Sequence, residues 1–449
     1  MFDKRIQPLP ELLCPAGSPE ALDAAIEGGA DAVYLGGTAF NARMNAHNFG
    51  GDALRSAVLR AHAYGVKVYL TLNTLILDRE CEELLATAAD LYRMGVDAVI
   101  VADLGVMAEV RRILPDVELH VSTQASVVSA AACAAYASLG ASRIVLAREL
   151  MLDEIKRIRA GLDPAISLET FIHGSMCISY SGRCLLSNFY TGRDSNRGAC
   201  AQFCRLEFDL QDADGKVIDN GRHLLSLKDM NRSASIEEML DAGVTSFKIE
   251  GRLKDASYVK NITAYYREKL DAVFARRKEF ERASQGKSYP QFTPAPEKSF
   301  NRGFTDYMLY GAKDGMTSFE SPKSKGEYMG RVKFVSRYYF TVVGGDFNNG
   351  DGACFVGRDG KLQGFRINKV EGNRVFPQTM PRIESGDELY RNYDCDFERQ
   401  LSRPDSPRRI AISLRFSDSA FGFSLQATDE SGVEHCIEMP FKKEVARSS

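Results

Sequence analysis

The sequence predicts an α/β protein: a TIM-type (β/α) barrel with a cysteine-rich insertion, then a small β-barrel-like domain and a short β-rich C-terminal piece. Three observations predict this order. Eight short apolar runs alternate with helical segments, four cysteines gather between the seventh and eighth runs, and short strands with Gly and Asn turns begin near residue 326. At 449 residues and 44% hydrophobic content, the chain is long enough for a catalytic domain and a smaller second domain.

The apolar runs are interpreted as barrel strands because each ends in a small or polar residue and each is followed by a helical pattern. They occupy residues 11–17, 30–37, 66–73, 96–103, 117–124, 142–149, 166–174 and 244–252. Between them, segments such as EALDAAIEGG repeat apolar residues at spacings of three and four and end in Gly, the usual helix stop. The alternative is a doubly wound sheet, but no GxGxxG follows the first strand.

The C-terminal ends of barrel strands meet at one end of the barrel, here called the mouth, where such enzymes place their chemistry. Glu169, His173, Glu250 and Arg252 are our candidate catalytic residues. Glu169 lies inside an apolar strand and needs a partner if it is buried. Arg252 suits a carboxylate because its fork binds both oxygens, whereas a structural hydrogen bond explains His173 equally well. Lys248 alternates onto the same strand face as Glu250.

Other polar residues end the predicted strands, and some of them are ordinary loop residues because strand ends meet water in any fold. They are Asn73, Asp103, Ser122, Thr123, Gln124, Arg148 and Glu149.

The segment HGSMCISYSGRCLLSNFYTGRDSNRGACAQFCRLEF places Cys177, Cys184, Cys200 and Cys204 at the spacing C-x6-C-x15-C-x3-C. Four soft thiolates are suited to an iron–sulfur cluster or to zinc. The spacing favours a cluster, because the paired C-x2-C knuckles of zinc sites are absent, but zinc and unligated thiols stay open. Among the other cysteines, only Cys14, at the end of the first strand, is expected at the mouth.

Four arginines, Arg183, Arg193, Arg197 and Arg205, alternate with these cysteines. Aromatic residues adjoin them: Tyr180, Phe189, Tyr190 and Phe203. Guanidinium and aromatic groups together serve phosphate contact and base stacking. Alternatively, the arginines offset the negative charge of the thiolates, and both roles are compatible.

Composition and charge restrict the location and the partners. The first residues contain no apolar run of signal-peptide length, and no stretch approaches the ~18 apolar residues of a membrane span, so we expect a cytoplasmic protein. Its ten cysteines should then stay reduced. A net charge of −3 and a pI near 6.2 give no overall attraction to polyanions, so an RNA substrate would need a local basic surface.

The pattern also indicates domain boundaries. A helical pattern of residues continues after the eighth strand to roughly residue 280, and a linker with Pro, Ser and Lys follows. We predict a barrel domain over 1–283 with the cysteine-rich insertion at 175–243, a linker at 284–325, a small β domain at 326–400 and a β-rich C-terminal segment at 401–449.

A peptidase and a non-enzymatic RNA-binding module are the two alternatives to an enzyme that acts on RNA. A peptidase is disfavoured because HExxH and GxSxG are absent and the six histidines form no metal-spaced pair. A Cys–His protease would need a reactive thiolate beside His173. A non-enzymatic RNA-binding module would not need a polar barrel mouth. Neither class explains four cysteines beside that mouth.

Several motifs resemble the collagenase-like proteins of family 32 of the unclassified (U) peptidases. The resemblance rests on ELLCPAGSPEALDAAIEGGADAVYLGG, LETFIHGSMCISYSGRCLLS, RGACAQFCR and SFKIEGRLKDASYVKNITAYYR, and it covers nearly the whole chain. Members of this family resemble RNA or quinone-precursor hydroxylases that carry an iron–sulfur cluster. The resemblance implies a cluster, of the 4Fe–4S type, on Cys177, Cys184, Cys200 and Cys204.

Further motifs resemble the branch of this family that makes 5-hydroxycytidine in 23S rRNA. They are HLLSLKDMN, FNRGFTDYML, NNGDGACFVG and ELYRNYDCDFERQL. A sister branch makes 5-hydroxyuridine at the tRNA wobble position with prephenate. The resemblance therefore implies an RNA substrate, dependence on iron, and prephenate or a related metabolite as cosubstrate. Whether a partner protein acts as electron donor stays open. Members of the ribosomal branch usually continue well past the point where this sequence ends, which leaves RNA selection open.

The mechanistic hypothesis is that the target cytidine leaves its stack and enters the mouth, where its C5 becomes accessible. A cluster beside the mouth would supply electrons or bind a reactive oxygen species. The sequence indicates neither the oxygen source nor an oligomeric state.

Overall fold

The computed structural model describes residues 9–37, 39–42, 49–312, 314–403 and 408–442. The eight predicted strands form a closed parallel barrel, because β11 pairs with both β1 and β7. The barrel strands are β1 Glu11–Pro15, β2 Ala32–Gly36, β3 Lys67–Leu72, β4 Ala98–Val101, β5 Glu118–Val121, β6 Arg143–Val145, β7 Ser167–Gly174 and β11 Ser246–Ile249. The TIM-type prediction is confirmed, and the doubly wound alternative is wrong.

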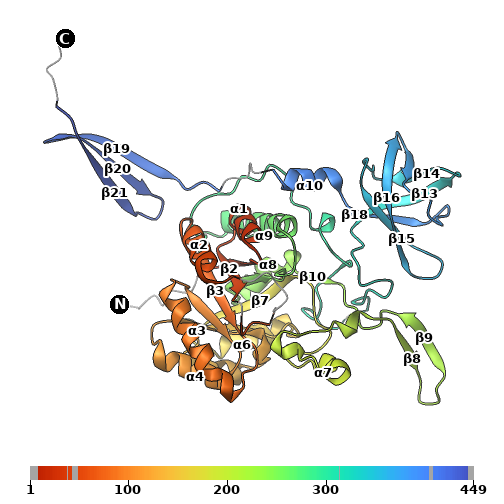
Figure 1. Ribbon diagram of the computed structural model, residues 1–449, viewed down its shortest axis with the longest axis horizontal. Coiled ribbons are helices and arrows are strands. Elements are labelled where there is room, and N and C mark those ends of the chain that lie inside the picture. The colour runs from red at the N-terminus through yellow and green to blue at the C-terminus, as the bar shows by residue number, and fades with distance from the viewer. Residues whose placement is uncertain (1–8, 38, 43–48, 313, 404–407, 443–449) are drawn as a thin grey trace, which may run out of the picture.

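Helices follow the barrel strands and surround them (Figure 1). They are α1 Pro19–Gly28, α2 Gly51–His62, α3 Cys81–Arg93, α4 Leu104–Ile113, α5 Ala130–Ser138, α6 Leu152–Ala160, α8 Ile236–Asp241 and α9 Ala256–Arg276. Several begin at a side chain that accepts a hydrogen bond from the first turn, which satisfies an otherwise unpaired N–H. Asp103 caps α4 in this way and Asp255 caps α9. Asp103 is thus one of the strand-end residues with an ordinary structural role.

The main core lies between the barrel and its helices. Alternate strand residues such as Leu168 and Ile172 of β7 point outward into this layer and are completely buried. Inside the barrel a second group includes Leu13, Tyr69 and Ile100, but charged side chains share that interior. A barrel interior of this kind is packed with side chains and is not a pore.

The insertion after β7 contains α7 Leu186–Thr191 and a hairpin of β8 Phe208–Gln211 and β9 Val217–Arg222. It returns through β10 Asp229–Asn231, which pairs antiparallel with the end of β7. The segment expected to be a linker contributes β12 Phe304–Thr305, which pairs with β10 and so extends the barrel sheet.

The small β-barrel-like domain is a closed six-stranded antiparallel barrel, as predicted. It packs around Phe340 and Phe355, and the short helix α10 Cys395–Leu401 follows it. Its strands are β13 Glu327–Val335, β14 Phe340–Gly344, β15 Gly352–Val356, β16 Leu362–Glu371, β17 Arg374–Pro377 and β18 Glu388–Tyr393.

The C-terminal piece is a three-stranded antiparallel sheet of β19 Ile412–Ser419, β20 Gly422–Asp429 and β21 Glu434–Pro440, which projects at one end of the molecule (Figure 1). The predicted β-rich character of this segment is confirmed. Within the residues that the structure describes, no helix combines the length and the apolar character needed to cross a bilayer.

Candidate active site at the barrel mouth

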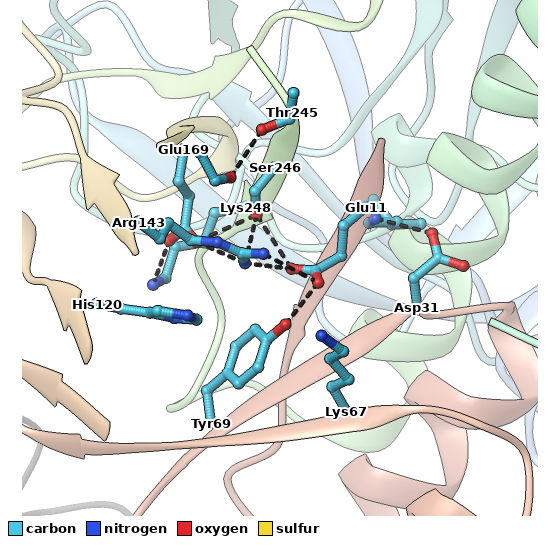
Figure 2. Close-up of polar contacts among 12 residues, drawn as sticks. Glu11, Asp31, Lys67, Tyr69, His120, Arg143, Glu169, Thr245, Ser246 and Lys248 are labelled. Atoms are coloured by element: carbon cyan, nitrogen blue, oxygen red, sulfur yellow. Dashed lines mark hydrogen bonds and ion pairs between the residues drawn. The ribbon is translucent and has the colours of Figure 1, made fainter. Parts of the chain in front are cut away.

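Glu169 lies inside the barrel and is completely buried (Figure 2). Its carboxylate accepts hydrogen bonds from Lys248 Nζ at 2.8 Å and Ser246 Oγ at 3.1 Å, and Arg143 lies 3.4 Å away. Burial alone would raise the pKa of Glu169, but the attraction of Lys248 and Arg143 outweighs it and lowers the pKa overall. Glu169 therefore has the partners that its buried position requires.

The same polar network closes the N-terminal half of the barrel (Figure 2). Arg143 also pairs with Glu11, and the hydroxyl of Tyr69 donates to Glu11 at 2.6 Å. Lys248 Nζ lies 4.4 Å from the centre of the Tyr34 ring. Most of these residues are the first or third of their strands, so they lie towards the N-terminal end of the barrel, away from the mouth. We call them the floor of the barrel.

At the mouth itself, Arg148 and Glu250 form an ion pair at 3.7 Å, with side chains 11% and 13% exposed. The Arg148 guanidinium also lies 4.2 Å from the centre of the Phe171 ring. Arg252 is buried and donates to Thr71 Oγ1 at 3.0 Å and Asn41 Oδ1 at 2.9 Å. The mouth thus combines a partly exposed acid–cation pair with a second, buried guanidinium.

His173 is only 2% exposed. Its ring lies among Tyr258, Tyr266 and Phe304, with Nδ1 3.3 Å from the Tyr266 hydroxyl. Burial lowers the pKa of His173 to about 4, against an opposing effect of Asp229. The imidazole is therefore neutral near pH 7 and enclosed by aromatic rings.

The cysteine-rich segment is attached directly to the barrel. The Ser181 N–H and hydroxyl donate to the Glu149 carboxylate at 2.5 and 3.2 Å, just beyond the end of β6. Arg197 pairs at 2.6 Å with Glu80, in the loop after β3. These contacts hold the segment over the strand ends, beside the mouth.

The four predicted ligand cysteines lie close enough to affect one another electrostatically. Burial raises the pKa of Cys177, Arg148 lowers it, and Cys184 and Cys200 raise it further. Burial also raises the pKa of Cys204, and the other three cysteines add to this effect. Among the described residues, no three His, Cys, Asp or Glu side chains stand at the spacing needed to hold a single metal ion. In an iron–sulfur cluster each thiolate binds a different iron, so a cluster does not require three of these side chains around one ion.

Side chains that donate hydrogen bonds to main-chain carbonyls fix the loops that carry the cysteines. Arg205 donates to the carbonyl of Met176 at 2.8 Å. Asn196 donates to the carbonyl of Cys184 at 3.0 Å, and Arg193 donates to that of Cys200 at 3.3 Å. Arg193 and Arg205, which the sequence predicts to contact RNA or to balance the thiolate charge, therefore also hold the loops of the segment in place.

Cys14 does not lie at the mouth as expected. Its sulfur accepts a hydrogen bond from Thr263 of α9 at 3.3 Å, and burial raises its pKa to about 12. Its side chain points into the layer between barrel and helices, where a thiol behaves as a small apolar group.

The structure adds a polar cluster that sequence reasoning missed. Asp229 accepts from Ser175 at 2.7 Å and from Arg302 at 3.1 Å. Beside it, Lys254 Nζ lies 3.1 Å from the centre of the Phe300 ring, and burial lowers the pKa of Lys254 to about 8. Phe300 and Arg302 belong to the motif FNRGFTDYML, on which the family resemblance partly rests. Nothing in the residue pattern of this motif indicated that the segment packs against the barrel.

The fold and this site define a TIM-type barrel protein whose mouth adjoins an insertion with four clustered thiols. More particularly, the chain belongs to peptidase family U32, whose model matches residues 17–318. A solved structure of a U32 peptidase covers 56% of this chain and 95% of its own, with a TM-score of 0.36 and 16% identity.

Three relatives have names that describe different activities. The 23S rRNA 5-hydroxycytidine synthase of Escherichia coli K12 is 42% identical over 444 residues, which are 96% of this chain and 67% of the relative. The tRNA hydroxylation protein P1 of Bacillus subtilis 168 is 40% identical over 277 residues, covering 60% and 65%. The collagenase of Porphyromonas gingivalis W83 is 32% identical over 398 residues, covering 84% and 93%. The chain spans about two thirds of the length of the first two.

Proposed function

We propose that this protein hydroxylates an RNA base, with a cytidine of 23S rRNA converted to 5-hydroxycytidine. The observation that carries the proposal is the 42% identity with the E. coli synthase over 96% of this chain. The tRNA hydroxylation proteins support the broader class of RNA hydroxylase. The collagenase relative keeps a peptidase as the second candidate.

We further propose that Cys177, Cys184, Cys200 and Cys204 bind an iron–sulfur cluster of the 4Fe–4S type. Support comes from the four soft thiols, which lie close enough to raise one another's pKa. Four thiolates at one place repel one another unless bound cations offset them, which irons would do. Such a cluster supplies one-electron transfer beside the mouth, and a partner protein is the proposed electron donor.

The chain's own residues would bind and orient the base. An unstacked cytosine at the mouth presents its N4 amino group, which can donate a hydrogen bond to a carboxylate. Glu250 supplies a carboxylate at that place. Arg148 holds the Glu250 side chain in place through their ion pair. Arg252, joined to Thr71 and Asn41, fixes the wall of the mouth.

Two of the four candidate catalytic residues would act through the fold. Glu169 holds Lys248 and Arg143 within the barrel floor, and His173 packs among aromatic rings. The cosubstrate that we propose, prephenate or a related metabolite, carries carboxylates. Arg252 and Lys254 place cationic groups near the mouth that suit such an anion.

Mass spectrometry of RNA from cells lacking this gene tests the function. We expect 5-hydroxycytidine to disappear from 23S rRNA while wobble hydroxyuridine in tRNA remains. Loss of hydroxyuridine alone would move the assignment to tRNA, and no change in either base would contradict an RNA hydroxylase. Peptide cleavage by iron-free protein, abolished by a single cysteine substitution, would favour the peptidase.

Anaerobic purification tests the cluster separately. We expect a brown protein with iron and acid-labile sulfide, whose visible absorbance Cys200→Ala removes. Cys436→Ala is the matched control, because Cys436 is also exposed but lies in the C-terminal sheet. A colourless protein with stoichiometric zinc would contradict the proposal.

A further inference from the structure

The cysteine-rich segment exposes large apolar side chains to solvent. Tyr180 is 70% exposed, Phe189 81% and Tyr190 58%, and Leu185 between them is 71% exposed. Single exposed apolar residues are common on proteins, but a contiguous group of rings marks a binding surface. Phe189 and Tyr190 are neighbours whose rings contact each other, and we call these two residues the aromatic platform.

The platform is joined to the cysteine loops. The Phe189 and Tyr190 rings meet edge to face with centres 5.1 Å apart. Tyr190 stacks on Phe203 at 4.9 Å, and Phe203 directly precedes Cys204 in the chain. Tyr190 is thus supported from behind, while Phe189 projects into solvent.

Positive charge lies on the same segment. Arg183 and Arg193 are both exposed, and Arg193 additionally donates to the carbonyls of Ala199 and Cys200. A segment that exposes both aromatic rings and guanidinium groups suits an RNA strand, because bases stack on the rings while phosphates meet the cations. This charge complementarity favours RNA over an apolar protein surface as the occupant.

We propose that the aromatic platform stacks bases of single-stranded RNA adjacent to the target nucleotide. The inference rests on the proposed function. Moving a base into the barrel mouth removes stacking from its neighbours in the strand, and exposed rings beside the mouth replace that stacking. The contacts of Ser181 with Glu149 and of Arg197 with Glu80 keep the segment at the mouth, where those neighbouring bases must lie.

Fluorescence tests the proposal directly, because the chain contains no tryptophan. Phe189→Trp introduces a single reporter at the platform. Phe421→Trp is the matched control, since Phe421 is 79% exposed in the turn between β19 and β20 of the C-terminal sheet. The probe is a short single-stranded oligoribonucleotide of mixed sequence, added to the full-length protein. Quenching at position 189 and not at 421 supports the platform. Equal quenching at both positions, or none at 189, overturns it.

Affinity provides the second readout. Phe189→Ala should weaken binding of the same oligoribonucleotide about tenfold, as the loss of one stacked base predicts, whereas Phe421→Ala should not. Visible absorbance and the unfolding midpoint of Phe189→Ala should match the wild type, which separates stacking from a folding defect. If Phe189→Ala binds the oligoribonucleotide as tightly as the wild type does, the proposal is overturned. This holds even if the variant turns over more slowly with a protein electron donor. If RNA quenches the fluorescence of Phe189→Trp but the enzyme leaves the mass of the RNA bases unchanged, the platform is supported. That result contradicts only the proposed hydroxylase function.

Discussion

The buried charges of the barrel floor depend on one another. Glu169 contacts Lys248, Arg143 and Ser246 where water does not reach, so each charge is stable only while its partners remain. The lowered pKa of Glu169 stabilises the fold above the ordinary carboxyl value of 4.5, and this stabilisation is lost as the pH falls through the lowered pKa.

Lys248→Met should therefore destabilise the protein by about 3–5 kcal/mol, because it leaves the Glu169 carboxylate without its nearest cation. Urea unfolding at pH 7 measures the free energy of unfolding. Adding Glu169→Gln to Lys248→Met should recover part of the loss. A single variant as stable as the wild type would contradict the interdependence.

His173 predicts a second dependence on pH, at higher values. Its pKa falls from 6.5 to about 4 on folding, so the unfolded chain binds the proton more readily. Its contribution is complete above pH 6.5 and declines as the pH falls towards 4, by about 3 kcal/mol in total. His173→Phe should abolish this decline, measured as the unfolding midpoint between pH 4.5 and 7. An identical pH profile in the variant would argue against the buried, neutral imidazole.

Sequence reasoning identified residue types better than their surroundings. It anticipated that Glu169 needs a partner, because a carboxylate inside an apolar strand is costly to bury. It did not anticipate the enclosure of His173, since Tyr258, Tyr266 and Phe304 come from α9 and β12, far along the chain. The partners of Arg252 likewise come from the opposite end of the barrel domain.

At the scale of elements, the attachment of the insertion depends on a close backbone approach. Gly182 has a φ of +71°, and a Cβ there would lie 2.0 Å from the carbonyl oxygen of Gln124, beyond the end of β5. Gly192 ends α7 with a φ of +69°, but a Cβ there would meet nothing within 4 Å. The two glycines thus share a backbone conformation and differ in their surroundings.

Gly182→Ala should displace the cysteine segment from the mouth, whereas Gly192→Ala should cost only about 1 kcal/mol of backbone strain. The expected result is loss of most visible absorbance in Gly182→Ala, with far-ultraviolet circular dichroism preserved. Iron content of the two purified variants is the measurement. Equal iron in both would show that the contact with Gln124 does not position the cysteines.

The sequence predicted long, periodic elements well and short ones poorly. All eight barrel strands follow from apolar runs and the helices between them. β10 and β12 were not predicted, because each has only two or three residues and they pair across more than 70 positions of chain. Such strands depend on tertiary contacts and leave no periodic pattern.

At the scale of the whole molecule, the C-terminal sheet has one apolar and one polar face. Strand pairing places Leu414 opposite Ala427, and Phe416 opposite Leu425, on the apolar face. Leu414 is 66% exposed and Phe416 63%. The neighbouring Arg415 alternates onto the polar face. A continuous apolar face of this kind is unusual on a monomer surface.

We therefore expect concentration-dependent association, or strong binding of a hydrophobic dye, that the double variant Leu414→Ser, Phe416→Ser reduces. Arg415→Ser, on the polar face of the same strand, is the matched control. Sedimentation velocity over a range of concentrations measures the effect. If both variants and the wild type sediment alike and bind the dye equally, the apolar face does not drive association.

We propose that the four cysteines beside the barrel mouth serve RNA hydroxylation. The most direct test expresses the full chain in cells lacking the gene and measures 5-hydroxycytidine in 23S rRNA by mass spectrometry. Wild-type chain and Cys436→Ser should restore the modified base, and Cys177→Ser should not, although it accumulates to the same level. Restoration by Cys177→Ser equal to that by wild type would contradict a role of the four cysteines in the reaction.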